Sequence, residues 1–87
     1  MAEWRFILLG PARSYLERLS LEERRRIFDA LDQMVEDPRS FFLNVKRLKG
    51  RPEWSLRVGD RRALLRVDKV ARLFIVTRIG PRGDVYK

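Results

Sequence analysis

Residues 54–79 read WSLRVGDRRALLRVDKVARLFIVTRI, and this stretch carries the signals that decide the fold. Apolar and polar side chains alternate on both sides of Gly59 and Asp60, as expected for a hairpin with one buried face. A second turn at residues 68–70 precedes a nearly continuous apolar run, which is typical of a central strand buried on both faces. We therefore predict three antiparallel strands, at 54–58, 62–67 and 73–79.

The residues before this stretch predict one more strand and two helices. Residues 4–9 are largely apolar and end at a Gly-Pro pair, which indicates a first strand. Apolar residues then recur at helical spacing through 12–19. Ser20 and Glu23 have the capping-box pattern of a helix start, and the helical period continues to residue 36.

The segment 39–52 shows no regular period, and it predicts a connection without helix or strand. Pro38 ends the preceding helix because the residue before a proline avoids helical dihedral angles. Four apolar residues of the connection are expected to plug the edge of the core: Phe41, Phe42, Leu43 and Val45. Four basic residues then cluster around Gly50, at the entrance to the next strand: Lys46, Arg47, Lys49 and Arg51.

The predicted order of elements is strand, helix, helix, strand, strand, strand, within one domain of residues 1–87. Two helices joined by a very short turn form a hairpin that must lay its apolar stripe on another element. The simplest solution is one face of a twisted, mostly antiparallel sheet. We therefore predict the fold class α+β, with an N-terminal strand, a helical hairpin and a three-stranded meander in one sheet, and with the helices on one face.

Positive charge is concentrated in one half of the chain. Residues 46–87 carry thirteen basic and four acidic side chains, whereas residues 1–45 carry seven basic and eight acidic ones. Sixteen of the twenty basic residues are Arg, whose planar guanidinium can bind a phosphate with two parallel hydrogen bonds. A polyanion is the expected partner of this half. A thermophilic or GC-rich source is the alternative explanation for the Arg content.

The composition also excludes several kinds of site. The chain has no Cys and no His, which excludes disulfides, thiolate nucleophiles and metal sites built from these residues. No apolar run approaches the roughly twenty residues needed to span a bilayer, and the N-terminus lacks the pattern of a signal peptide. We therefore expect a soluble cytoplasmic protein without a metal site of this kind, and we expect no cofactor.

The predicted hairpin brings two arginines together. If Leu56 and Leu65 face the helices, the alternation of the strands sends Arg57 and Arg62 to the opposite face, as neighbours. Like charges opposed across a sheet are destabilising, so this pair favours an anionic ligand or acidic neighbours. A solvated basic face without a ligand remains open as an alternative.

Three segments together resemble the RelE/ParE superfamily of bacterial and archaeal toxins. They are KRLKG at 46–50, WSLRVGDRR at 54–62 and RIGPRGDVY at 78–86. The first strand, the helical hairpin and the Asp37-Pro38 break are similar too, so the resemblance covers nearly the whole chain. It implies the toxin of a type II toxin–antitoxin system.

One branch of this superfamily cuts messenger RNA in the ribosomal A site, through attack of a ribose 2′-hydroxyl on the adjacent phosphate. The resemblance implies such a metal-independent endoribonuclease, with mRNA, the ribosome and an acidic or amphipathic antitoxin segment as partners in a hetero-oligomer. By match to the family, the catalytic residues are Arg57, Arg62, Arg82 and Tyr86. Further basic residues are expected to bind RNA or the ribosome: Lys46, Arg47, Lys49, Arg51, Arg61, Arg66 and Arg78.

This chain also departs from the family pattern. Ser55 stands where the nuclease branch often has Lys, and Pro81 stands where a basic residue or His is common. Because Arg does not deprotonate in proteins, Tyr86 or solvent is left as the proton acceptor. An aromatic anchor for the tail is the alternative role of Tyr86. A ParE-like inhibitor of DNA gyrase without catalysis, and a catalytically weak RNA-binding relative, are the alternative functions.

Overall fold

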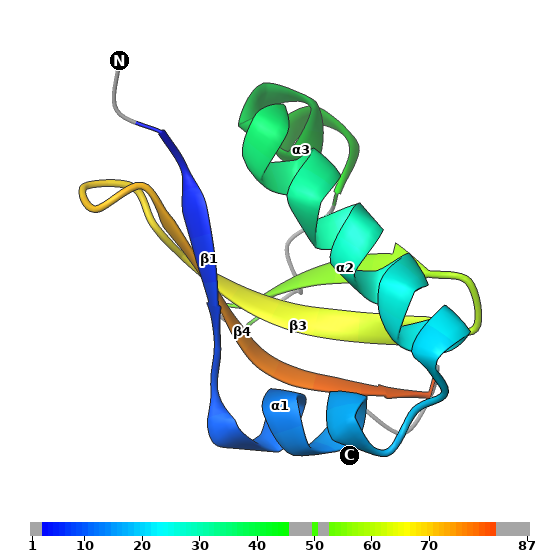
Figure 1. Cartoon of the computed structure of the whole chain (residues 1–87). Coiled ribbons are helices and arrows are strands. Elements are labelled where there is room, and N and C mark those ends of the chain that lie inside the picture. Colours follow the sequence, from blue (N-terminus) through cyan, green and yellow to red (C-terminus); the bar gives the residue numbers. More distant parts are fainter. Residues whose placement is uncertain (1–2, 46–49, 51–52, 82–87) are drawn as a thin grey trace.

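The computed structural model describes residues 3–45, 50 and 53–81 of the chain. Figure 1 shows a curved sheet with helices packed against it. The elements in chain order are β1 (Arg5–Leu8), α1 (Gly10–Glu17), α2 (Leu21–Glu36), α3 (Pro38–Asn44), β2 (Trp54–Val58), β3 (Arg61–Asp68) and β4 (Leu73–Pro81). The predicted α+β class is confirmed.

The sheet has the strand order β1-β4-β3-β2, and the predicted antiparallel meander of β2, β3 and β4 is confirmed. The first strand joins it in parallel, from Arg5 opposite Leu73 to Leu8 opposite Val76. Beyond Val76 this edge of β4 is covered by α1 instead (Figure 1). The first helix therefore lies along the end of β4, where it can line a site together with that strand.

The core lies between α2 and one face of the sheet, as predicted. Ile27 and Leu31 of α2 are buried, and so are Leu65, Phe74 and Val76 of the two central strands. Along residues 73–78 of β4 the buried Phe74 and Val76 alternate with half-buried or exposed residues, so the expectation that this strand is buried on both faces is wrong. No helix within the described residues is both long enough and apolar enough to cross a membrane.

The start of α2 follows half of the predicted capping box. The Ser20 hydroxyl accepts a hydrogen bond from the Glu23 backbone N–H at 3.2 Å. The Glu23 carboxylate binds Arg61 of β3 instead of returning to the backbone of Ser20. A charge-assisted contact to another element thus replaces the second half of the local motif.

The expectation of an irregular connection from residue 39 is wrong, because residues 38–44 form α3. The Asp37 side chain accepts a hydrogen bond from the Ser40 N–H at 3.1 Å, and Pro38 occupies the first turn, where its missing N–H costs nothing. Phe41 is buried in the core, and Phe42 and Val45 pack against it, as predicted. Leu43 does not, since it is 78% exposed.

Candidate nucleic-acid interface

The side of the sheet away from α2 carries several arginines, and we call it the open face. Arg57 of β2 lies directly opposite Arg62 of β3, as the sequence predicted. On β4, Arg78 pairs with Leu64 and Gly80 pairs with Arg62. The open face includes Arg57, Arg62, Arg66 and Arg78, because each of them is next in sequence to a residue that lies in the core or packs against it: Leu56, Ala63, Leu65 and Ile79.

The two opposed arginines differ in how they are held. Arg62 is half-buried, and its Nη1 donates a hydrogen bond to the Ser55 hydroxyl at 3.2 Å. Arg57 is exposed, and no carboxylate of the described residues forms an ion pair with it. One guanidinium is thus oriented by the sheet while the other extends into solvent. The exposed Arg57 therefore leaves positive charge that an anion can compensate.

One acidic neighbour compensates part of the positive charge of the open face further along β3. Arg66 Nη2 lies 3.9 Å from a carboxylate oxygen of Glu53. The contact is at the outer limit of an ion pair, and the Arg66 side chain is 58% exposed, so it remains accessible. Sequence reasoning missed one more arginine on this face. Arg5 alternates with Phe6 and Leu8 of β1, which pack on the core, and this alternation could have found it.

Arg61 lies on the opposite side of β3 and does not join the other arginines. Its Nε donates a hydrogen bond to the Tyr15 hydroxyl at 3.1 Å, and its Nη2 donates to Glu23 at 2.8 Å. The hydrogen bond to Tyr15, together with the charges of Tyr15, Glu23 and Asp60, raises the pKa of Arg61 against the opposing effect of burial. The structure thus gives Arg61 a part in joining α1, α2 and β3.

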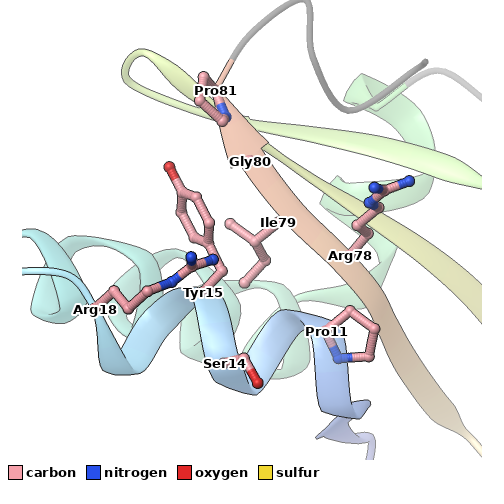
Figure 2. A pocket seen from close by; sticks show the side chains of 8 residues that line it. All are labelled: Pro11, Ser14, Tyr15, Arg18, Arg78, Ile79, Gly80 and Pro81. Carbon is pink, nitrogen blue, oxygen red and sulfur yellow. The ribbon is translucent and has the colours of Figure 1, made fainter.

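A hollow of about 300 Å³ lies between α1 and the end of β4, next to the open face (Figure 2). In Figure 2 the Tyr15 ring stands between Arg18 and Ile79, with its hydroxyl toward Pro81. The Arg18 guanidinium lies 5.8 Å from the centre of the Tyr15 ring, within the range of a cation–π contact. Arg78 also lines the hollow, and its side chain leaves β4 on the side away from Tyr15.

The remaining predicted site residues lie outside the described residues. They are Lys46, Arg47, Lys49 and Arg51 before β2, and Arg82 and Tyr86 after β4. The structure thus brings together two of the four predicted catalytic residues, Arg57 and Arg62, and places Arg66 and Arg78 on the same face.

Comparison with known proteins gives structural matches only. No protein-family model matches the chain, and no curated protein matches it. The RelE–RelB complex of Pyrococcus horikoshii matches with a TM-score of 0.77 and 21% identity, over 95% of this chain and 99% of that one. A RelBE toxin–antitoxin complex of Mycobacterium tuberculosis matches with a TM-score of 0.76 and 19% identity, over 93% of this chain and 100% of that one.

A third match is the isolated Escherichia coli RelE toxin, with a TM-score of 0.73 and 20% identity, over 98% of this chain and 92% of that one. These matches cover at least 93% of this chain, in structures of toxin–antitoxin complexes and of an isolated toxin. At this level of identity they establish the architecture, and they confirm the fold that the sequence resemblance implied. The chain has the fold of the RelE toxins.

Proposed function

We propose that this chain is the toxin of a type II toxin–antitoxin pair and that it cuts messenger RNA on the ribosome. The observation that carries the proposal is the pair formed by Arg57 and Arg62 on the open face of a RelE fold. Two guanidinium groups at neighbouring positions suit one phosphate, since each offers forked donors to its oxygens.

The proposed reaction needs no metal. The ribose 2′-hydroxyl oxygen bonds to the adjacent phosphorus, and the bond from phosphorus to the next 5′-oxygen breaks. One proton leaves the 2′-hydroxyl for a base and one reaches the departing 5′-oxygen. Arg62 and Arg57 would stabilise the charge that grows on the phosphate oxygens. Arg82 joins them in this proposal, with Tyr86 as the proton acceptor, because Arg itself does not deprotonate.

Other basic residues would hold the RNA without touching the reacting atoms. Arg66 and Arg78 extend the open face along β3 and β4, and the cluster at residues 46–51 adds charge at the start of β2. Such contacts steer a polyanion and make binding depend strongly on salt. Arg61 has no part in this surface, because its guanidinium binds Tyr15 and Glu23.

An antitoxin is the second proposed partner. The Mycobacterium match was solved as a toxin–antitoxin complex, and the Pyrococcus match was solved as a complex of RelE with RelB. An acidic, amphipathic segment that orders on binding would neutralise the open face of this chain. We expect its affinity to fall strongly between low and high salt, because exposed charges are screened. An affinity that is independent of salt would contradict this form of neutralisation.

The decisive experiment maps the ends of a translated message by primer extension after expression of the wild type, Arg62→Ala and Arg82→Ala. Arg25→Ala is the matched control, since Arg25 is an exposed arginine on α2. We expect discrete cuts within codons from the wild type and the control, and none from the two variants. Growth arrest with DNA damage and an uncut message would instead support the gyrase-inhibitor alternative.

A further inference from the structure

The hollow between α1 and β4 has no part in the proposed cleavage, and its walls are well defined. Tyr15 is fixed there from two sides, by the hydrogen bond from Arg61 and by the Arg18 guanidinium beside its ring. Ser14 adds a hydroxyl at the wall formed by α1 (Figure 2). The hollow therefore combines an aromatic ring, an exposed cation and a small polar group.

We propose that this hollow binds one nucleotide of single-stranded RNA, next to the nucleotide whose phosphate lies over Arg57 and Arg62. The inference rests on the proposed function in taking RNA as the ligand. Its chemistry is that of single-strand recognition, in which bases lie against aromatic rings and cations hold the backbone. A volume of about 300 Å³ lies at the small end of ligand pockets, which suits a single nucleotide.

The position of the hollow supports this assignment. Gly80 lines the hollow and is the residue of β4 directly opposite Arg62. Paired Cα atoms in antiparallel strands are about 4.5–5.5 Å apart, so the hollow begins one strand away from the arginine pair. Arg78 lines the hollow too, and it belongs to the open face. Because Tyr15 binds Arg61 on the helix side of the sheet, an RNA strand would reach both places by passing around the edge of β4 at its end.

The chemistry of the walls favours RNA over the acidic antitoxin segment. An acidic, amphipathic peptide would need a carboxylate and an apolar side chain at matching positions to use both the Arg18 charge and the Tyr15 ring beside it. A nucleotide uses both, through the phosphate and the base. The Arg18 guanidinium would move from the Tyr15 ring to the phosphate, and the base would take its place against the ring. Ser14 would contact a polar edge of the base or sugar.

The test measures binding of a fully 2′-O-methylated oligoribonucleotide, which cannot be cleaved, by fluorescence anisotropy. Ser14→Trp fills the hollow and Arg18→Ala removes its cation, while Arg13→Ala removes an exposed arginine of α1 that does not line it. We expect affinity about tenfold lower for Ser14→Trp and Arg18→Ala, and an unchanged affinity for Arg13→Ala. Loss of the Arg18 phosphate contact should also reduce the slope of the logarithm of the binding constant against the logarithm of the salt concentration, by about 0.7.

A measurement on the wild type avoids any effect of substitution on folding. Irradiation of an oligonucleotide that carries 5-iodouridine should attach it to Tyr15, as read by mass spectrometry of the digested protein. Adducts confined to residues of the open face would overturn the inference. So would a Ser14→Trp variant that binds RNA like the wild type but binds the antitoxin more weakly.

The two proposals can fail separately. If primer extension shows cuts while the hollow variants bind RNA like the wild type, only the nucleotide site is wrong. If no message is cut but Tyr15 is still crosslinked and Ser14→Trp still weakens RNA binding, the nuclease proposal is wrong and the nucleotide site remains.

Discussion

Arg57 and Arg62 lie opposite each other across the β2–β3 hairpin, with Arg57 exposed and Arg62 hydrogen-bonded to Ser55. Like charges at directly opposed positions of a sheet lower its stability. The opposed pair therefore lowers the stability of the fold at the place where positive charge is concentrated. Such a loss of stability is common at functional sites.

We predict that Arg57→Gln raises the free energy of unfolding by about 0.2–1 kcal/mol at low salt, because it removes this repulsion. Urea titrations at low and high salt would measure it. Since Arg57 is exposed, the gain should shrink at high salt. Arg39→Gln, on α3, is the control and should change stability little. The same Arg57→Gln change should weaken RNA binding. A variant that is less stable than the wild type and cuts RNA equally well would refute the idea that Arg57 lowers stability in exchange for function.

The contacts of Arg61 predict a second, purely structural effect. Tyr15→Phe removes the acceptor of one hydrogen bond and should lower the free energy of unfolding by about 1 kcal/mol. Glu23→Gln should cost less, about 0.5 kcal/mol, because the side chains of Arg61 and Glu23 are 28% and 42% exposed. Both changes act on the guanidinium of Arg61. The change in the free energy of unfolding of the double variant should therefore differ from the sum of the changes in the two single variants. Additive effects in that cycle would show that the two contacts are independent.

Arg61 should contribute the same stability throughout the physiological pH range. Its pKa is raised by the Tyr15 hydrogen bond, so its contribution is fully present below the ordinary Arg pKa and is lost only when pH rises through the folded value. The difference in unfolding free energy between the wild type and Arg61→Met should therefore be constant from about pH 6 to 9. A difference that changes across this range would point to another titrating group.

Much of the sheet could be predicted from sequence because its signals are local. Alternation on β2 and β3 and the Gly59-Asp60 turn determine which residues face each other, and the pairing of Arg57 with Arg62 follows from them. The same alternation would have placed Arg61 on the helix side, opposite to Arg62. That inference was missed because the strand was expected to begin one residue later than it does.

Other features depend on contacts between distant residues. Glu23 fits a capping box by sequence, yet it binds Arg61, 38 positions away. The third helix is not evident from sequence because Pro38 marks the end of α2, although Asp37-Pro38 is also a standard helix start. The parallel pairing of β1 with β4 joins the two ends of the chain, and no local pattern specifies its register.

The cap of α3 can be tested directly. Asp37→Ala removes the acceptor for the Ser40 N–H and should lower the free energy of unfolding by about 1 kcal/mol. Asp37→Asn keeps an acceptor oxygen and should restore most of this loss, which separates capping from charge. Thermal and urea unfolding of the two variants would measure the difference. Equal losses in Asp37→Ala and Asp37→Asn would rule out the cap as the cause.

The end of α1 depends on a residue of α2. The Arg24 side chain donates hydrogen bonds to the backbone oxygens of Leu16, Glu17 and Leu19, at 3.2–3.4 Å. Carbonyls at a helix end have no partner within the helix, so these bonds stabilise it. Arg24→Ala should lower the free energy of unfolding by about 1–2 kcal/mol, as measured by urea titration. Arg25→Ala, at the next and exposed position, should lower it by less than about 0.5 kcal/mol. Similar losses at both positions would refute this role.

The register that sets Arg57 opposite Arg62 depends on the two-residue turn, and Gly59 in that turn has φ of 59°. A Cβ at Gly59 would meet no atom within 4 Å, so the cost of Gly59→Ala is conformational, about 1 kcal/mol. Gly10→Ala is the matched control, because its site is equally open, lies at the start of α1 and has no positive φ. The control should be neutral or stabilising. Urea titrations of both variants give the comparison, and amide exchange in β2 and β3 should show the register of Gly59→Ala unchanged.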